Sequence, residues 1–218
     1  MKLLRSIFDR LFAAFRKSDA IEYVKTRNIT DYIRWVQSEA ARLDNNDETK
    51  DKYLRKLRKE AFPIKLFLEN TPSLPIVEIS LSYQNESWDA KGKLKSNGAH
   101  QNAIYIEVTG TRGYNGDNQH LRIYRAPSPQ ITDSDDLSQY AQLIKDRIYK
   151  KTQNTNYDKS YILLVYCEVM HSSKNQFGSL IEILHKDSEI NALLEKSVFE
   201  GIYVIQWDGQ HAYQAKIK

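Results

Sequence analysis

Two acidic residues and a threonine are the residues of this chain whose types and spacing suit catalysis. Asp89 lies in the polar stretch WDAKGKL, and Glu107 and Thr109 lie in the apolar run AIYIEVTG. Because side chains alternate along a β-strand, Glu107 and Thr109 are expected to point to the same face. Asp89 comes alongside them if the two segments pair as neighbouring strands. We therefore predict one site that contains all three side chains.

Two carboxylates at this spacing suit a hard divalent cation such as Mg²⁺, or Mn²⁺ in its place. Mg²⁺ prefers oxygen ligands and keeps several waters. A cation held by Asp89 and Glu107 would activate a water and stabilise the charge of a phosphodiester under attack. Two simpler interpretations are open: Asp89 is a turn carboxylate beside Gly92, and Glu107 forms an ion pair with Lys91 or Lys93 on the strand face.

The N-terminal part of the chain is predicted to be mainly helical. Residues 2–17 place Leu and Phe at helical spacing on one face and basic residues mostly on the other. We expect this face to be covered by protein, from the same chain, from a second copy or from a partner. Attachment to a membrane surface is the alternative. A helix capped by Thr30 and a helix over 48–69, kinked or restarted at Pro63, are expected next.

After the turn-rich stretch NTPSLP, the sequence pattern changes from helical spacing to short strand-like segments. The segments IVEISLSYQ, WDAKGKL and AIYIEVTG follow one another with short connections, which indicates an antiparallel meander. A helix over about 136–151 comes next. The run YILLVYCEV has no alternation, which is typical of a strand buried on both faces of a parallel sheet. Further helices, the strand GIYVIQWDG and a returning segment AYQAKIK complete the chain.

The sequence therefore predicts an α/β fold with a mixed sheet. A three-strand antiparallel meander is followed by helix, strand, helix and strand, and a helical extension precedes it. We divide the chain into a helical region, 1–70, and a mixed-sheet core, 71–218, with the helix at 48–69 packed against that core.

This order of elements and the spacing of Asp89 and Glu107 resemble the PD-(D/E)XK nuclease superfamily, which has the restriction-endonuclease-like fold. The core of that family runs helix, three-strand meander, helix, strand. Its motif places an Asp on the second strand and Glu-x-Lys on the third. The resemblance covers roughly residues 50–207, and the topology carries more of it than the short motif does. It implies that Asp89 and Glu107 bind the metal, with Glu60 of the preceding helix as a third ligand.

Thr109 stands where the family has its lysine. That lysine orients or deprotonates the attacking water and offsets charge on the phosphate, whereas a threonine hydroxyl brings no positive charge. A displaced lysine is therefore expected, and Lys91, Lys93 and Lys145 are the candidates. The implied catalytic residues are Asp89, Glu107, Thr109 and Lys91. The alternative is a family member that has lost catalysis and acts as a protein- or nucleic-acid-binding subunit.

The charge and cysteine content are compatible with this interpretation. The net charge is +4 and the isoelectric point is about 8.9, which suits an anionic partner such as nucleic acid. A single cysteine excludes a disulfide within the chain, and we expect a cytoplasmic protein. Basic and aromatic residues beside the third strand are expected to form a rim for a nucleic-acid backbone and stacked bases. They are Lys65, Arg112, Arg122, Arg125, Tyr114 and Tyr124.

Overall fold

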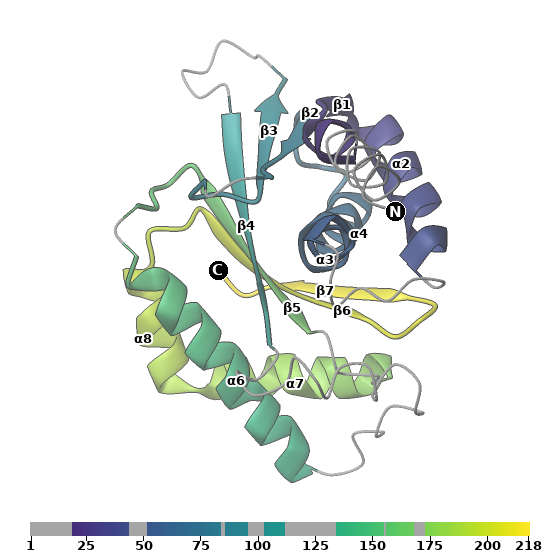
Figure 1. Ribbon diagram of the computed structural model, residues 1–218. Helices are drawn as coiled ribbons and strands as arrows, with labels where there is room; N and C mark the ends of the chain where they lie inside the picture. Colours follow the sequence, from purple (N-terminus) through teal and green to yellow (C-terminus); the bar gives the residue numbers. More distant parts are fainter. Residues whose placement is uncertain are drawn as a thin grey trace, which may run out of the picture.

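A seven-stranded mixed sheet with helices on both faces forms the body of the protein (Figure 1). The strands lie in space in the order of the sequence, from β1 to β7. The predicted α/β class and mixed sheet are therefore confirmed. The structure is a computed structural model and describes residues 19–43, 52–83, 86–95, 103–111, 134–154, 156–167 and 173–218.

The first half of the sheet is an antiparallel meander. β2 (Ile76–Leu81) pairs with β3 (Ala90–Leu94), and β3 pairs with β4 (Ala103–Gly110), as predicted. A two-residue strand that the sequence did not suggest, β1 (Arg27–Asn28), lies at the edge and pairs with β2. The meander places the end of β4 beside the next strand of the sheet.

The second half of the sheet is built on parallel pairs. β5 (Tyr161–Cys167) is parallel to both β4 and β6 (Gly201–Trp207), and every residue of β5 is buried. This confirms the prediction of a central strand. β7 (Ala212–Lys216) returns antiparallel to β6, also as predicted. The helices of this half are α6 (Ser134–Thr152), α7 (Lys174–Lys186) and α8 (Ser188–Lys196).

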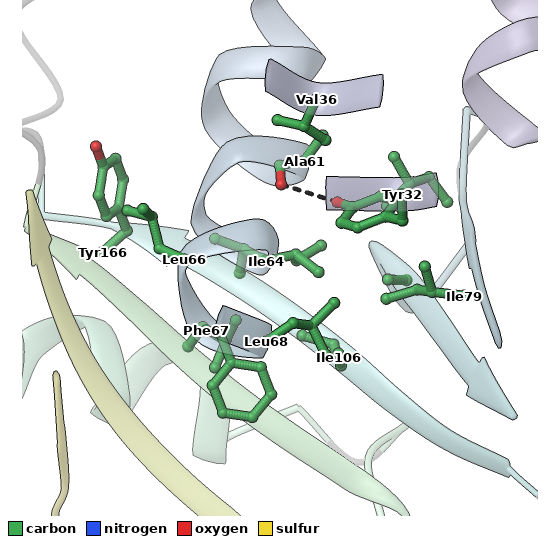
Figure 2. Close-up of a cluster of buried hydrophobic side chains, with 14 of the residues drawn as sticks. Tyr32, Val36, Ala61, Ile64, Leu66, Phe67, Leu68, Ile79, Ile106 and Tyr166 are labelled. Carbon is green, nitrogen blue, oxygen red and sulfur yellow. Dashed lines mark hydrogen bonds between the residues drawn. The ribbon is translucent and has the colours of Figure 1, made fainter. Parts of the chain in front are cut away.

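One hydrophobic core lies on each face of the sheet. The N-terminal helices cover one face, with Phe67, Ile79 and Ile106 buried between them and the strands (Figure 2). Helices α6, α7 and α8 cover the other face, where Ile144 and Leu163 are buried. The helical elements of the first layer include residues 19–24, α2 (Ile29–Leu43), α3 (Lys52–Lys56), the π-helical turn η1 (Leu57–Ala61) and α4 (Phe62–Asn70).

The π-helical turn explains how the helix from residue 52 to residue 70 accommodates Pro63. A proline inside an α-helix cannot donate, and its ring clashes with the carbonyl four residues earlier. Here the N–H of Phe62 donates to the carbonyl of Leu57, five residues earlier, and α4 begins at Phe62. This turn contains Glu60, and π-helical turns often mark functional sites.

The expected cap of α2 is corrected, and one strand is irregular. Asn28, and not Thr30, caps α2, because its Oδ1 accepts the backbone N–H of Asp31 at 2.9 Å. Val77 is 37% exposed, because a register shift between Ile76 and Glu78 interrupts the alternation of β2.

Lys65 does not belong to the basic and aromatic rim that was expected from the sequence. Lys65 is buried within α4, and its ammonium group lies 2.7 Å from Glu69. The other rim residues and the expected helix at 1–18 lie outside the described residues. None of the helices in the described part of the chain combines the length and hydrophobicity that a membrane span requires.

Replacement of Tyr32 tests the contact between α2 and the π-helical turn. The Tyr32 hydroxyl donates to the carbonyl of Ala61 at 2.8 Å inside the core (Figure 2). Tyr32→Phe should lower the free energy of unfolding in urea by about 1 kcal/mol, because a buried hydrogen bond is lost. Tyr149→Phe, whose ring is 55% exposed on α6, is the matched control and should leave the stability unchanged. Equal stability of both variants would contradict this contact.

Candidate active site

Asp89 lies immediately before β3, where the pairing between β3 and β4 ends. Its backbone N–H donates to the carbonyl of Ile106 at 2.9 Å, and its carboxylate Oδ2 accepts the N–H of Val108 at 2.8 Å. The Asp89 carboxylate therefore accepts the hydrogen bond that a backbone carbonyl would accept if β3 were longer. This holds the carboxylate near the plane of the sheet, and its charge influences groups on both faces, Tyr23 on one and Glu107 on the other.

Glu107 lies on the face of β4 that packs toward α6. Its cross-strand partner Leu163 belongs to the core on that face, and Glu107 itself is only 7% exposed. Lys151, in the last turn of α6, forms an ion pair with its Oε1, and Tyr157 forms a hydrogen bond with it. We refer to Glu107, Lys151 and Tyr157 as the Glu107 cluster.

Glu60 lies on the opposite face, in the π-helical turn. The ammonium group of Lys56, one turn earlier, is 2.8 and 2.6 Å from its two carboxylate oxygens. The hydroxyl of Tyr23 donates to the same carboxylate at 3.1 Å, and Lys56 also donates to the carbonyl of Ser82 at 3.2 Å. We refer to Glu60, Lys56 and Tyr23 as the Glu60 cluster.

Asp89 is electrostatically coupled to both clusters. Its charge raises the pKa of Glu60 on one face and of Glu107 on the other, while Lys56 and Lys151 stabilise its ionised form. The structure thus brings the three sequence-predicted ligands, Glu60, Asp89 and Glu107, into one electrostatic unit. When all are ionised, three carboxylates face two ammonium groups, and the unit carries a net negative charge.

Burial makes this negative charge unfavourable. Burial first, and the charge of Asp89 second, raise the pKa of Glu107 to about 7, although Lys151 and Tyr157 oppose the shift. The same two causes raise the pKa of Glu60 to about 7 against the opposing effect of Lys56. Burial also raises the pKa of Asp89, against the N–H of Val108 and both lysines. Protons or a cation are needed to neutralise the unit near neutral pH.

Lys151 carries a positive charge in this environment. Burial disfavours its ammonium form, but the Glu107 carboxylate more than compensates, and the pKa of Lys151 is raised. A lysine with a raised pKa is protonated at neutral pH and cannot act as a base. It can donate hydrogen bonds and bring a positive charge to a developing negative one, and Thr109 has no such charge.

The lysines proposed from the sequence occupy other places. Lys145 forms ion pairs with Asp187 and Glu189, at 3.2 and 2.8 Å, between α6 and α8. It is therefore not the displaced lysine beside Glu107. Lys93 lies 3.2 Å from Glu78. Lys91 is exposed, and its Nζ lies 5.7 Å from the ring centroid of Tyr105, which precedes Glu107 by two residues.

Thr109 lies on the same face of β4 as Glu107. The register between β4 and β5 is regular from Tyr105 to Gly110, and Val165, the partner of Thr109, belongs to the same core as the partner of Glu107. The expected placement of Thr109 beside Glu107 thus follows from the period of the strand. Its side chain is partly exposed.

Sequence reasoning missed Lys56, Tyr23, Lys151 and Tyr157. Lys56 had a visible signal, because it lies four residues before Glu60 in a predicted helix. Lys151 had a weaker signal. Because β5 is parallel to β4, the helix that connects them must end near the start of both strands. No local pattern marks Tyr23 or Tyr157.

The donor chemistry of Asp89 and Glu107 fits a divalent cation. Both supply carboxylate oxygens, and a cation would offset the burial that raises both pKa values and the repulsion from Asp89 that further raises that of Glu107. Among the described residues, no three His, Cys, Asp or Glu side chains come together at the spacing of a metal site. Mg²⁺ often uses only one or two protein carboxylates and keeps water as its other ligands.

Comparisons of this chain with models of known families, with curated proteins and with solved structures gave no match. Its function must therefore be argued from the geometry of the two clusters and Asp89.

The raised pKa of Glu107 predicts a pH-dependent stability. The pKa lies near 4.5 in the unfolded chain and near 7 in the folded chain, so the folded state binds more protons between these values. The contribution is fully present below about pH 4.5 and is lost as the pH rises through 7. Glu107→Gln should reduce the loss of unfolding free energy between pH 5 and pH 8 by about 1 to 3 kcal/mol.

Urea unfolding at several pH values, with a chelator present, measures this dependence. Glu182→Gln, an exposed carboxylate on α7, is the matched control and should keep the wild-type pH dependence. The same pH dependence in Glu107→Gln and wild type would show that Glu107 is already ionised at low pH.

Proposed function

We propose that this protein is a divalent-metal-dependent phosphodiesterase that acts on nucleic acid, with the restriction-endonuclease-like fold. The order of elements supports the proposal, because α3–α4, the meander β2–β4, α6 and β5 follow the order of that family's core. The observation that carries it is the electrostatic coupling of Asp89 with Glu107 and Lys151. Glu107 lies on β4, Asp89 lies immediately before the neighbouring strand β3, and a lysine from the next helix would supply the charge that Thr109 lacks.

Asp89 and Glu107 would hold Mg²⁺ or Mn²⁺ in this proposal. Glu60 would add negative charge from the opposite face of the sheet. When bound, such a cation supplies Lewis acidity to a phosphodiester and makes the attacking water more acidic. The N–H of Val108 orients the Asp89 carboxylate, so that this ligand is fixed before substrate arrives.

Lys151 would take over the role of the missing motif lysine. With a cation held by Asp89 and Glu107, the ion pair between Lys151 and Glu107 would be weaker, and the Lys151 ammonium group would be available to contact the phosphate. Because Lys151 stays protonated, it stabilises charge and orients groups but does not remove the proton from water. The hydroxyl of Thr109, on the same face as Glu107, can position the water by a hydrogen bond.

One observation favours the alternative, a non-catalytic binding module. Lys151 neutralises Glu107 within the protein, so its ammonium group can substitute for a metal ion in the folded state. In that case the carboxylates would be structural, and the protein would act by binding nucleic acid or a protein partner. Activity assays of single variants separate the two functions.

Metal-dependent cleavage by the wild type is the expected result. Single- and double-stranded DNA and RNA should be cleaved with Mg²⁺ or Mn²⁺ and not with a chelator. Asp89→Asn and Glu107→Gln should lower the rate at least ~100-fold, because each removes a ligand charge. Lys151→Met should lower it about 10- to 100-fold, whereas Lys150→Met, its exposed neighbour on α6, should not.

Thr109→Lys distinguishes a working site from a lapsed one. With Lys151 already in place, a second lysine on the same face should crowd the site and lower activity. In a lapsed site with intact metal ligands, the wild type should be inert and Thr109→Lys should recover weak cleavage. If neither protein cleaves and neither is stabilised by the metal, the nuclease proposal is wrong and the binding module remains.

A further inference from the structure

A row of aromatic side chains crosses the sheet beside Glu107. The ring centroids of Trp88 and Tyr105 are 6.0 Å apart, and those of Tyr105 and Tyr161 are 5.0 Å apart in a stacked arrangement. We refer to Trp88, Tyr105 and Tyr161 as the aromatic row. Tyr161 is buried, but Trp88 and Tyr105 are only partly buried. Both partly buried rings lie on strands or strand ends that also carry the candidate metal ligands.

The exposed part of the row adjoins both carboxylates. Trp88 directly precedes Asp89, and Tyr105 lies two residues before Glu107 on the same face of β4. Two residues along a strand span about 6.6 Å, so the Tyr105 ring is close to the Glu107 cluster. Figure 1 shows that β3 and the first part of β4 extend beyond α6, α7 and α8 among the described segments. Trp88 and Tyr105 pack at the margin of the core beneath these helices and stay partly exposed.

A positive charge accompanies the rings. Lys91 is the cross-strand partner of Tyr105, is exposed, and holds its ammonium group 5.7 Å from the ring centroid. The row is also rigid at its buried end, because Tyr161 stacks on Tyr105, contacts the Tyr157 ring and has its hydroxyl 3.1 Å from Ser87 Oγ. A fixed, partly open ring beside a cation suits a base and its phosphate.

We propose that the aromatic row and Lys91 bind single-stranded nucleic acid, with a base stacked on Tyr105 or Trp88 and the next phosphate at the divalent cation that Asp89 and Glu107 would hold. The inference rests on the proposed function and names its substrate class. A duplex keeps its bases stacked on one another, so only an unpaired base can reach these rings. Lys91 then contacts the backbone and is not part of the reacting site.

Binding of oligonucleotides with and without bases tests this inference. We would measure fluorescence anisotropy of the full chain with labelled oligothymidylate of about 12 nucleotides, with oligouridylate of the same length, with an abasic strand and with a duplex. Ca²⁺ replaces Mg²⁺ to limit cleavage. The strands with bases should bind about tenfold more tightly than the abasic strand and the duplex.

Substitutions then assign the binding to the row. Tyr105→Leu and Trp88→Leu, which keep an apolar side chain without an aromatic face, should each weaken binding of oligothymidylate about tenfold. Tyr105→Phe should bind as the wild type does, and it preserves the test if the leucine variant is unstable. Tyr149→Leu, an exposed tyrosine on α6 outside the row, is the matched control.

The outcomes separate this inference from the proposed function. Base-dependent binding that both leucine variants lose supports the aromatic row even if no cleavage occurs, and the nuclease proposal then fails alone. Metal-dependent cleavage of single strands that is unaffected by Tyr105→Leu and Trp88→Leu overturns the row and leaves the nuclease intact. Equal binding of abasic and base-containing strands, or no binding at all, also overturns the row.

Discussion

The burial of carboxylate charge is the constraint on which the rest of this structure depends. The charge of Asp89 raises the pKa of Glu60 in the π-helical turn and of Glu107 on β4, and burial opposes the charge of all three. The fold limits the cost with one lysine and one tyrosine for each glutamate and with the N–H of Val108 for Asp89. The remaining repulsion is tolerated in the folded state, as is common where a protein retains groups for function.

The backbone is shaped to hold these groups. The meander ends its β3–β4 pairing at Asp89, which frees the N–H of Val108 to bind a carboxylate in place of a carbonyl. The π-helical turn contains Glu60, and Tyr32 holds its end through the carbonyl of Ala61. The last turn of α6 brings Lys151 to Glu107 because β5 must begin beside the start of β4. Each cluster thus depends on the packing of a different helical layer against one sheet.

The parts of this arrangement that depend on short-range periodicity were predictable from the sequence. The period of two along β4 placed Glu107 and Thr109 on one face, and the short connections indicated the meander. The parts that depend on packing between distant segments could not be predicted from the sequence. Lys151 is 44 residues from Glu107 and Tyr23 is 37 residues from Glu60, so no local pattern links them. The π-helical turn directly precedes the first turn of α4, which contains Pro63, and the register shift beside the exposed Val77 has no signature in the alternating run IVEISLSYQ.

The central claim is that Asp89 and Glu107 hold one divalent cation and that Lys151 gives way to it. Anomalous diffraction from crystals soaked in Mn²⁺, compared with crystals kept in a chelator, measures both events at once. The account predicts a single anomalous peak between the two carboxylates, with the Lys151 ammonium group moved away from Glu107 only in the soaked crystals. Crystals without a peak at this position, in which Lys151 keeps its ion pair with Glu107 at high Mn²⁺, would contradict it.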